Sequence, residues 1–185
     1  MHDPIQLLER DHRQVEQLFA QYQQSKDPGL VQKICTELTV HAAIEEKVVY
    51  PALGTDVPGG KGMRRHAEDE HQEVKDAIFE IERLGYGDPG VDQYMQTIIK
   101  GVKEHVAEEE GEVLPKMRNE LTPERLAAMG QELEETKARL LPDAQESGPL
   151  IDLTRDKLYE LAQEKGIEGR ADMTKDELIS ALRSS

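Results

Sequence analysis

The sequence has a single cysteine, no tryptophan, two phenylalanines and no long apolar run. One thiol cannot close a disulfide within the chain, nor can it supply a cysteine-based metal cluster. No apolar stretch approaches the roughly 20 residues that a membrane span requires. The start of the chain, Met1-His2-Asp3-Pro4, has neither the basic residues nor the apolar stretch of a secretory signal. These absences predict a cytoplasmic protein that does not cross a membrane.

Basic residues are also scarce, with 23 Lys and Arg against 38 Asp and Glu, and the formal net charge is −15. A field of this sign repels nucleic-acid phosphates and anionic membrane surfaces, which disfavours both kinds of partner. The chain also lacks a Ser-His-Asp arrangement, a phosphate-binding glycine loop and a dinucleotide fingerprint. Conventional hydrolase, kinase and dehydrogenase functions therefore have no support in the sequence.

Helix starts are clearly marked. At four places a capping residue comes directly before a proline, which is suited to the first helical position. These pairs are Asp3-Pro4, Asp27-Pro28, Asp88-Pro89 and Thr122-Pro123. Together with apolar residues at helical spacing, they predict helices over about 4–24, 28–50, 62–84, 90–119 and 123–140. Short connections imply antiparallel neighbours. We therefore predict an all-α fold, an antiparallel up-down four-helix bundle with a fifth helix, over residues 1–140.

Four histidines and two glutamates stand within the apolar stripes of these helices. They are His12, His41, Glu45, His71, His105 and Glu109. Their surroundings repeat between the two halves of the bundle. Asp11-His12-x-x-Val15 matches Glu70-His71-x-x-Val74, and His41-x-x-x-Glu45-Glu46 through Pro51 matches His105-x-x-x-Glu109-Glu110 through Pro115. Each pair of helices thus supplies one lone histidine and one His-x-x-x-Glu pair, which packing alone does not explain.

Helix geometry indicates which glutamate of each repeat points with its histidine. Positions four apart differ by only about 40° around the axis, so His41 and Glu45 point the same way. The same holds for the second His-x-x-x-Glu pair. The following glutamates, Glu46 and Glu110, are turned about 140° from their histidines. We expect these two to face solvent or an adjoining helix.

Carboxylates inside an apolar core point to a bound cation. A buried carboxylate without a partner costs several kcal/mol, and a metal ion removes that penalty. Four imidazoles and two carboxylates suit a transition ion such as iron, whereas calcium and magnesium prefer oxygen ligands. Six side chains are too many for one tetrahedral zinc. We predict two ions, each with two histidines and bridged by the two glutamates, with a position open for a small ligand.

At these residues the sequence resembles the hemerythrin-like family, also called the HHE cation-binding domain. The resemblance covers roughly residues 3–120 and rests on four motifs in order: Asp11-His12; His41 to Glu46 through Tyr50-Pro51; Glu70 to Val74; and His105 to Glu110 through Pro115. It implies a four-helix bundle with a non-haem di-iron centre whose ligands, by position, are the six residues above. It also implies chemistry with dioxygen, nitric oxide or peroxide, or sensing of redox or iron status.

The sequence departs from the family pattern at one place and leaves a second ligand scheme open. Oxygen-carrying hemerythrins have a further histidine where this chain has Ala67, with His66 adjacent but about 140° from His71. This departure favours a sensor, scavenger or peroxide-handling role over a reversible oxygen carrier. In the second scheme, Glu9-x-x-His12 and Glu68-x-x-His71 have the spacing of ferritin-like di-iron carboxylate sites, so Glu9 or Glu68 would add a ligand.

A different pattern begins after a predicted linker over residues 141–149. Residues 150–185 contain two short leucine-rich helices joined by Gly166-Ile167-Glu168-Gly169, with a capping box at Thr174-Lys175-Asp176-Glu177. This module resembles the N-terminal helical domain of transcription termination factor Rho and the similar SAP modules. The resemblance implies contact with nucleic acid. From Gly148 onward, however, six Lys or Arg stand against eight Asp or Glu, a net of −2 that disfavours it and leaves a protein-docking or structural role open. Arg155, Lys157 and Arg170 are the local basic candidates.

Three functions remain open from the sequence. The first is a di-iron protein that binds or senses a small ligand or redox state. The second is an enzyme with the same centre that decomposes peroxide or handles nitric oxide. The third is a nucleic-acid-associated regulator that acts through the C-terminal module. The oligomeric state is not indicated by the sequence.

Overall fold

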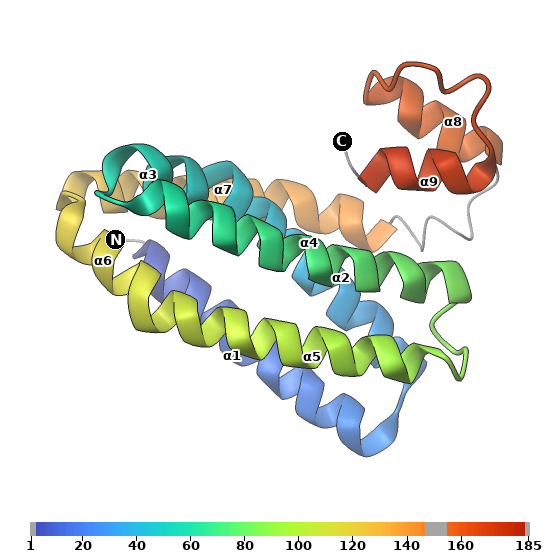
Figure 1. The fold of residues 1–185 in the computed structure, drawn as a ribbon, viewed down its shortest axis with the longest axis horizontal. Coiled ribbons are helices and arrows are strands. Elements are labelled where there is room, and N and C mark those ends of the chain that lie inside the picture. Colours follow the sequence, from blue (N-terminus) through green and yellow to red (C-terminus); the bar gives the residue numbers. More distant parts are fainter. Residues whose placement is uncertain (1–2, 147–154, 184–185) are drawn as a thin grey trace.

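The computed structural model describes residues 3–146 and 155–183, and every regular element in these ranges is a helix (Figure 1). The α-helices are α1 (Pro4–Ser25), α2 (Pro28–Ile44), α3 (Tyr50–Asp56), α4 (Gly60–Leu84), α5 (Val91–Glu108), α6 (Leu114–Glu120), α7 (Pro123–Glu146), α8 (Arg155–Glu164) and α9 (Lys175–Arg183). Two π-helical turns, η1 (Glu45–Val49) and η2 (Glu109–Val113), continue α2 into α3 and α5 into α6. The all-α fold class predicted from the sequence is confirmed for the described residues.

Three of the four capping residues expected from the sequence hold helix starts. Asp3 accepts a hydrogen bond from Ile5 N, Asp27 accepts one from Gly29 N, and Thr122 accepts one from Arg125 N. Each bond satisfies an N–H group near the start of a helix that has no partner within that helix. The cap expected at Asp88 is wrong, because Asp88 accepts from Gly90 N in the turn before α5, which begins at Val91 and has no side-chain cap.

Two predicted helices are longer than expected. The segment predicted over 28–50 stays helical to Asp56, and the one predicted over 123–140 stays helical to Glu146. Most of the predicted linker over 141–149 therefore belongs to α7, and its last residues lie outside the described ranges.

The π turns are the main feature that the sequence analysis did not anticipate. In each, the residue after the turn donates its N–H to the carbonyl of the glutamate five positions back: Tyr50 to Glu45 and Leu114 to Glu109. A proline follows in both places, at Pro51 and its repeat counterpart. Proline has no N–H and its ring conflicts with the carbonyl four residues earlier, and a wider turn relieves this conflict. Both repeated glutamates thus begin a local widening of the helix.

The helices pack in pairs around a layered interior. Helix α1 contacts α2, α4 contacts α5, and α7 lies against both α1 and α2 (Figure 1). One apolar cluster lies toward α3 and α6 and is built around Leu8, Ile44, Leu53, Met117 and Met129. A second, built around Phe19, Ile34, Ile78, Met95 and Ile98, lies toward the other end. Along each of the first four long helices, the predicted metal-binding residues fall between these two clusters.

The C-terminal helices have an apolar cluster of their own. Leu158, Ala162, Leu178, Ile179 and Leu182 are buried together, and Phe79 of α4 packs against them. The capping box predicted at the start of α9 is present, since Glu177 accepts a hydrogen bond from Thr174 N (2.7 Å) and Thr174 Oγ1 accepts one from Glu177 N (3.3 Å).

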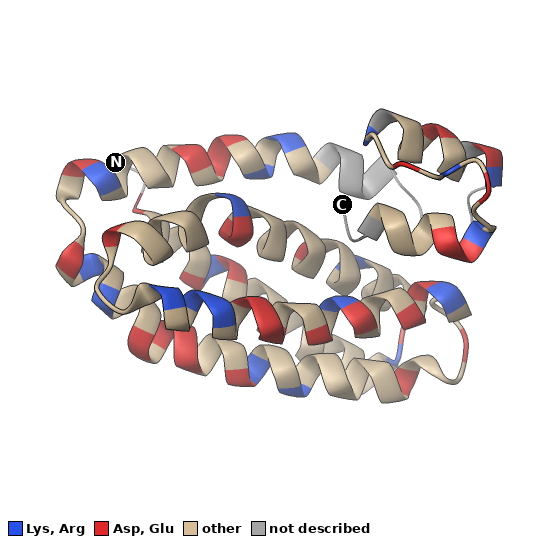
Figure 2. Cartoon of the chain, turned by 45° about the horizontal axis from the view of Figure 1, so that its top comes forward, with Lys and Arg blue, Asp and Glu red and all other residues tan. Residues whose placement is uncertain are grey.

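Acidic residues are spread over many helices (Figure 2). Asp and Glu residues occur along the bundle helices as well as on the C-terminal pair. In the part of the chain that the structure describes, no helix is long and apolar enough to cross a membrane.

Candidate metal centre

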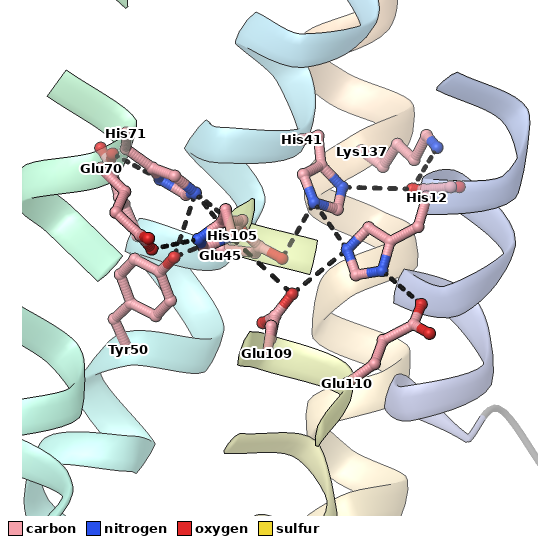
Figure 3. Close-up of polar contacts among 12 residues, drawn as sticks. His12, His41, Glu45, Tyr50, Glu70, His71, His105, Glu109, Glu110 and Lys137 are labelled. Atoms are coloured by element: carbon pink, nitrogen blue, oxygen red, sulfur yellow. Dashed lines mark hydrogen bonds and ion pairs between the residues drawn. The ribbon is translucent and has the colours of Figure 1, made fainter. Parts of the chain in front are cut away.

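The structure brings all six predicted residues together in the layer between the two apolar clusters (Figure 3). Helix α1 contributes His12, α2 and its π turn contribute His41 and Glu45, α4 contributes His71, and α5 and its π turn contribute His105 and Glu109. All six side chains are buried, and Glu45 has an exposed fraction of 0%. They form two groups of potential ligands that share Glu45.

The first group joins His12, His41, Glu45 and Glu109. The Nε2 atoms of His12 and His41 lie 3.2 Å apart. His41 Nε2 is 3.0 Å from Glu45 Oε1, and His12 Nε2 is 3.2 Å from Glu109 Oε2. Two imidazole nitrogens and two carboxylates thus converge on one small volume, which is the donor set that a borderline transition ion prefers.

The second group joins Glu45, His71 and His105. The Nε2 atoms of the two histidines lie 3.3 Å apart, and His71 Nε2 is 3.1 Å from Glu45 Oε2. His105 Nε2 lies 3.9 Å from Glu45 Oε2 and also 3.9 Å from Glu109 Oε2. Glu45 therefore turns one oxygen to each group, as a bridging carboxylate does.

Each of the four histidines turns its other ring nitrogen toward a carboxylate outside the groups. His12 Nδ1 donates to Glu110 (2.8 Å), His71 Nδ1 to Glu46 (3.2 Å) and His105 Nδ1 to Glu70 (2.8 Å), while His41 Nδ1 lies 4.0 Å from Asp11. A carboxylate at Nδ1 fixes the orientation of an imidazole and raises its basicity as a metal ligand. This arrangement is typical of histidines that bind metals.

These outer carboxylates follow the sequence repeat and connect the two halves of the bundle. We call α1 and α2 with the turn η1 the first hairpin, and α4 and α5 with the turn η2 the second. Asp11 and Glu70, which precede the lone histidines, face the His-x-x-x-Glu histidine of their own hairpin. Glu46 and Glu110 reach the lone histidine of the opposite hairpin. Both glutamates therefore reach an adjoining helix, which was one of the two expected alternatives, and Glu110 is also 38% exposed to solvent.

Two further residues complete the surroundings of the centre and were not found from the sequence. Lys137 of α7 donates to Asp11 Oδ2 at 2.6 Å. The Tyr50 hydroxyl donates to Glu45 Oε2 at 3.4 Å and lies 3.1 Å from His71 Nε2. Tyr50 has no counterpart in the repeat, where Leu114 takes its place; it stood at the end of one family motif, but nothing in the sequence indicated a role for it. Asp11 and Glu70 belong to the repeated motifs, and this repetition could have identified them as partners of the histidines.

The residues of the second ligand scheme lie away from both groups. Glu68 accepts a hydrogen bond from Arg64 Nε at 2.7 Å, and Glu9 lies 3.9 Å from Arg13 Nη1. His66 is 60% exposed and faces Glu108. Ala67, at the place of the additional histidine of oxygen carriers, is buried. The structure therefore does not bring these side chains to the two groups.

Unsatisfied polar atoms show that the residues fit a bound cation. Among the described residues, the buried atoms that accept or donate no hydrogen bond include both carboxylate oxygens of Glu109, Oε1 of Glu45 and Nδ1 of His41. Glu109 Oε2 still lies at ion-pair distance from His12. Buried carboxylate oxygens without full partners are costly, and a metal ion bound between them would satisfy them.

The same crowding shifts the pKa values of the histidines. Burial alone would lower the pKa of His41, but the carboxylates of Glu45 and Asp11 outweigh it and raise the value to about 10. For His105, burial acts in the same downward direction, and Glu45 with Glu109 raises the pKa to about 9. Burial raises the pKa of Glu45, but the histidines hold it well below its ordinary range. Without a metal ion the centre thus contains histidinium–carboxylate pairs.

Two cavities adjoin the centre. One, of about 30 Å³, is lined by the four histidines and by apolar side chains such as Val15, Leu38, Ile78 and Val102. It has room for about one or two water-sized molecules. The other, of about 90 Å³, extends from Tyr50, His105 and Glu109 to residues at the surface.

Comparisons with known proteins agree with this geometry. The profile of the hemerythrin HHE cation binding domain matches residues 3–117, and the profile of the Rho termination factor N-terminal domain matches residues 150–185. A protein named DNA nickase from Nostoc sp. (strain PCC 7120) is 29% identical over 138 residues, which cover 72% of this chain and 39% of that protein. The chain thus spans less than half the length of this relative. No solved structure matches it. Because the first profile covers more than half of the chain, the protein belongs to the hemerythrin HHE cation binding domain family.

Proposed function

We propose that the protein holds two non-haem iron ions between its four histidines and two glutamates and uses them to bind or sense a small ligand. The ligand is dioxygen, nitric oxide or peroxide, or the signal is redox or iron status. The observation that carries the proposal is the position of Glu45, whose two oxygens lie 3.0 Å from His41 and 3.1 Å from His71. A carboxylate between two pairs of imidazoles is suited to bridge two ions.

The donor set supports two ions of unequal surroundings. The first group offers four ligand residues and the second offers three. Since iron takes up to six ligands, both ions would keep positions for solvent or a small ligand, and the second would keep more. Bound iron would supply redox chemistry and an open coordination position. The residues themselves orient the imidazoles, neutralise charge and exclude bulk water.

An antiparallel up-down four-helix bundle is part of this proposal. The ligands come from α1, α2, α4 and α5, and consecutive members of each hairpin pack against one another. The short connection between α1 and α2 is the kind that joins antiparallel neighbours. In such a bundle, side chains from facing helices converge on a shared interior.

The smaller cavity supports a small ligand. Its volume of about 30 Å³ and its lining of valine, leucine and isoleucine side chains beside the histidines suit a diatomic molecule or peroxide. Ala67 in place of an additional histidine leaves the second group less saturated, which favours sensing or scavenging over oxygen transport. Tyr50 offers a hydroxyl at this less saturated group.

Metal analysis of freshly purified protein, with absorption spectra in air and after reduction, tests the proposal. We expect about two irons per chain and an absorption in air that bleaches on reduction. Absence of iron after anaerobic reconstitution with ferrous salt would contradict it. Rapid peroxide turnover by the iron-loaded protein that is lost in His105→Ala would instead identify an enzyme that uses the same centre.

A nucleic-acid-associated role is the second candidate, because residues 150–185 match the Rho N-terminal domain and a relative is named DNA nickase. The local basic candidates give it little support. Arg155 donates to the carbonyls of Met173 and Ala171, and Arg170 donates to the carbonyl of Ile167 and lies over the Tyr159 ring. Salt-sensitive binding of single- or double-stranded DNA by the full chain, weakened in Arg155→Ala, would favour this role. Lack of binding at low salt would exclude it.

A further inference from the structure

A second set of metal-ligating side chains lies at the surface, outside the buried centre. His66, Glu70 and Glu108 each offer an atom within 4.8 Å of the others. His66 Nε2 is 3.0 Å from Glu108 Oε2 and 3.6 Å from Glu70 Oε1. The side chains of His66 and Glu108 are 60% and 56% exposed, so the cluster faces solvent.

The cavity of about 90 Å³ begins at this surface cluster and reaches the buried centre. His66, Glu70 and Glu108 line its outer part, and Tyr50, His105 and Glu109 line its inner part. Its volume has room for several water-sized molecules, which is enough for a partly hydrated metal ion. A continuous space therefore joins solvent to the second group of ligands.

The inner end of the cavity carries a buried carboxyl group. Glu109 is 2% exposed and both of its carboxylate oxygens accept no hydrogen bond. With Glu70, Glu108 and Glu112 in the same lining, four carboxyl groups face the cavity beside the two imidazoles of His66 and His105. Such a lining attracts cations and repels anionic solutes.

Glu70 connects the two sites directly. Its Oε2 accepts a hydrogen bond from His105 Nδ1 at 2.8 Å, while its Oε1 faces His66 at 3.6 Å (Figure 3 shows Glu70 beside His105). One carboxylate thus orients a histidine of the buried centre and supplies an oxygen to the surface cluster.

We propose that His66, Glu70 and Glu108 form a solvent-facing site for a divalent transition-metal cation, from which ions reach the buried centre through this cavity. One imidazole and two carboxylates suit ferrous, manganous, cobaltous or zinc ions. Three ligands on an open surface leave the remaining positions to water, so binding is weaker and exchange faster than at the buried groups. The delivery step rests on the function proposed above, whereas binding at the surface does not.

Titration of the full chain with Co²⁺, followed by absorption and calorimetry, tests the surface site. We expect the chain to bind two equivalents of Co²⁺ tightly and a third more weakly. His66→Ala and Glu108→Gln should each lose only the third, weaker equivalent. Glu104→Gln is the matched control, because Glu104 lies one turn earlier on α5, is 61% exposed and faces Lys100. Glu70 is left unchanged because it also holds His105.

The outcomes separate the two proposals. A third equivalent that survives in both variants, or a wild-type chain without one, overturns the surface site. If the chain binds no Co²⁺ tightly but still binds one weak equivalent that is lost in His66→Ala, the surface site is supported and the di-metal function is contradicted.

Delivery is tested by the rate at which metal-free protein takes up Fe²⁺ at limiting concentration under anaerobic conditions. We expect the His66→Ala/Glu108→Gln variant to load about tenfold more slowly, the lower end of the effect of charge focusing on association. Its final iron content should equal that of the wild type and of Glu104→Gln. Equal loading rates in all three proteins would overturn delivery through this cavity.

Discussion

Lys137 on α7 donates a hydrogen bond to Asp11 on α1 across 126 positions of the sequence, and this contact ties the fifth helix to the metal centre. Asp11 Oδ2, which accepts it, is also the atom 4.0 Å from His41 Nδ1. The pKa of Asp11 is affected first by burial, which raises it, and then by His41 and Lys137, which together lower it below its ordinary value. The fifth helix therefore contributes a contact to the surroundings of the candidate metal centre.

The first prediction concerns this contact. In Lys137→Met the Asp11 carboxylate loses a partner and orients His41 less firmly. We expect metal affinity at the first group to fall about tenfold, the lower end of the effect of removing such outer partners. Competition with a chelator of known affinity measures the change. Arg139→Met, an exposed position on the same helix, should leave the affinity unchanged, and an equal loss in both variants would show a general effect of the helix.

The second prediction distinguishes the two glutamates. Glu45 belongs to both groups, whereas Glu109 belongs only to the first and lies 3.9 Å from His105. Glu45→Gln should therefore lose nearly all bound metal, while Glu109→Gln should retain about one ion per chain. Metal analysis after gel filtration measures both contents, with Glu9→Gln as a control that stays at about two. Identical losses in the two variants would contradict the bridging role of Glu45.

The third prediction concerns pH. In the metal-free protein the pKa values of His41 and His105 are about 10 and 9, above their ordinary value of 6.5. A metal ion binds the neutral imidazole, so binding must release protons and become tighter as pH rises from about 6 to 9. Calorimetry in two buffers of different ionisation enthalpy counts these protons. A binding constant that does not change with pH would show that the histidines are neutral before metal binds.

The same pKa shifts determine whether the stability of the metal-free protein rises or falls with pH. Groups with raised pKa values stabilise the folded state fully below the ordinary value of 6.5, and the contribution is lost as pH rises through about 9 to 10. The melting temperature of the metal-free protein should therefore fall over this alkaline range. The metal-loaded protein, whose imidazoles are already neutral, should show a smaller fall in the same scan.

The fourth prediction concerns Tyr50. Burial raises the pKa of its hydroxyl well above the ordinary value, and the surrounding carboxylates raise it further, so the group stays protonated and can donate. In Tyr50→Phe we expect the metal content to be kept and the affinity for azide, a small anionic probe of open positions, to change about tenfold. This is the scale of one hydrogen bond to a charged group. Tyr94→Phe, far from the centre, is the control; unchanged azide binding in Tyr50→Phe would exclude a role in ligand binding.

The sequence predicted what depends on local spacing. Asp3 and Asp27 marked helix starts because capping is a contact between near neighbours. His41 and Glu45 were placed on one face because one helical turn separates them. The π turn at Glu45 escaped prediction because a widened turn depends on Pro51 and on the packing around it. Lys137 escaped because its partner lies on another helix, at a distance that no spacing rule describes.

The crossed carboxylates have a consequence for the origin of the centre. Glu46 of the first hairpin holds His71 of the second, and Glu110 of the second holds His12 of the first. One hairpin on its own therefore lacks the partners that orient its lone histidine, whereas two identical hairpins facing each other would supply them reciprocally. The two hairpins thus contact each other as two identical subunits do in a self-complementary homodimer interface, although both belong to one polypeptide. A single chain also allows equivalent positions to differ, as Tyr50 and Leu114 do, so that the two halves of the centre are chemically different.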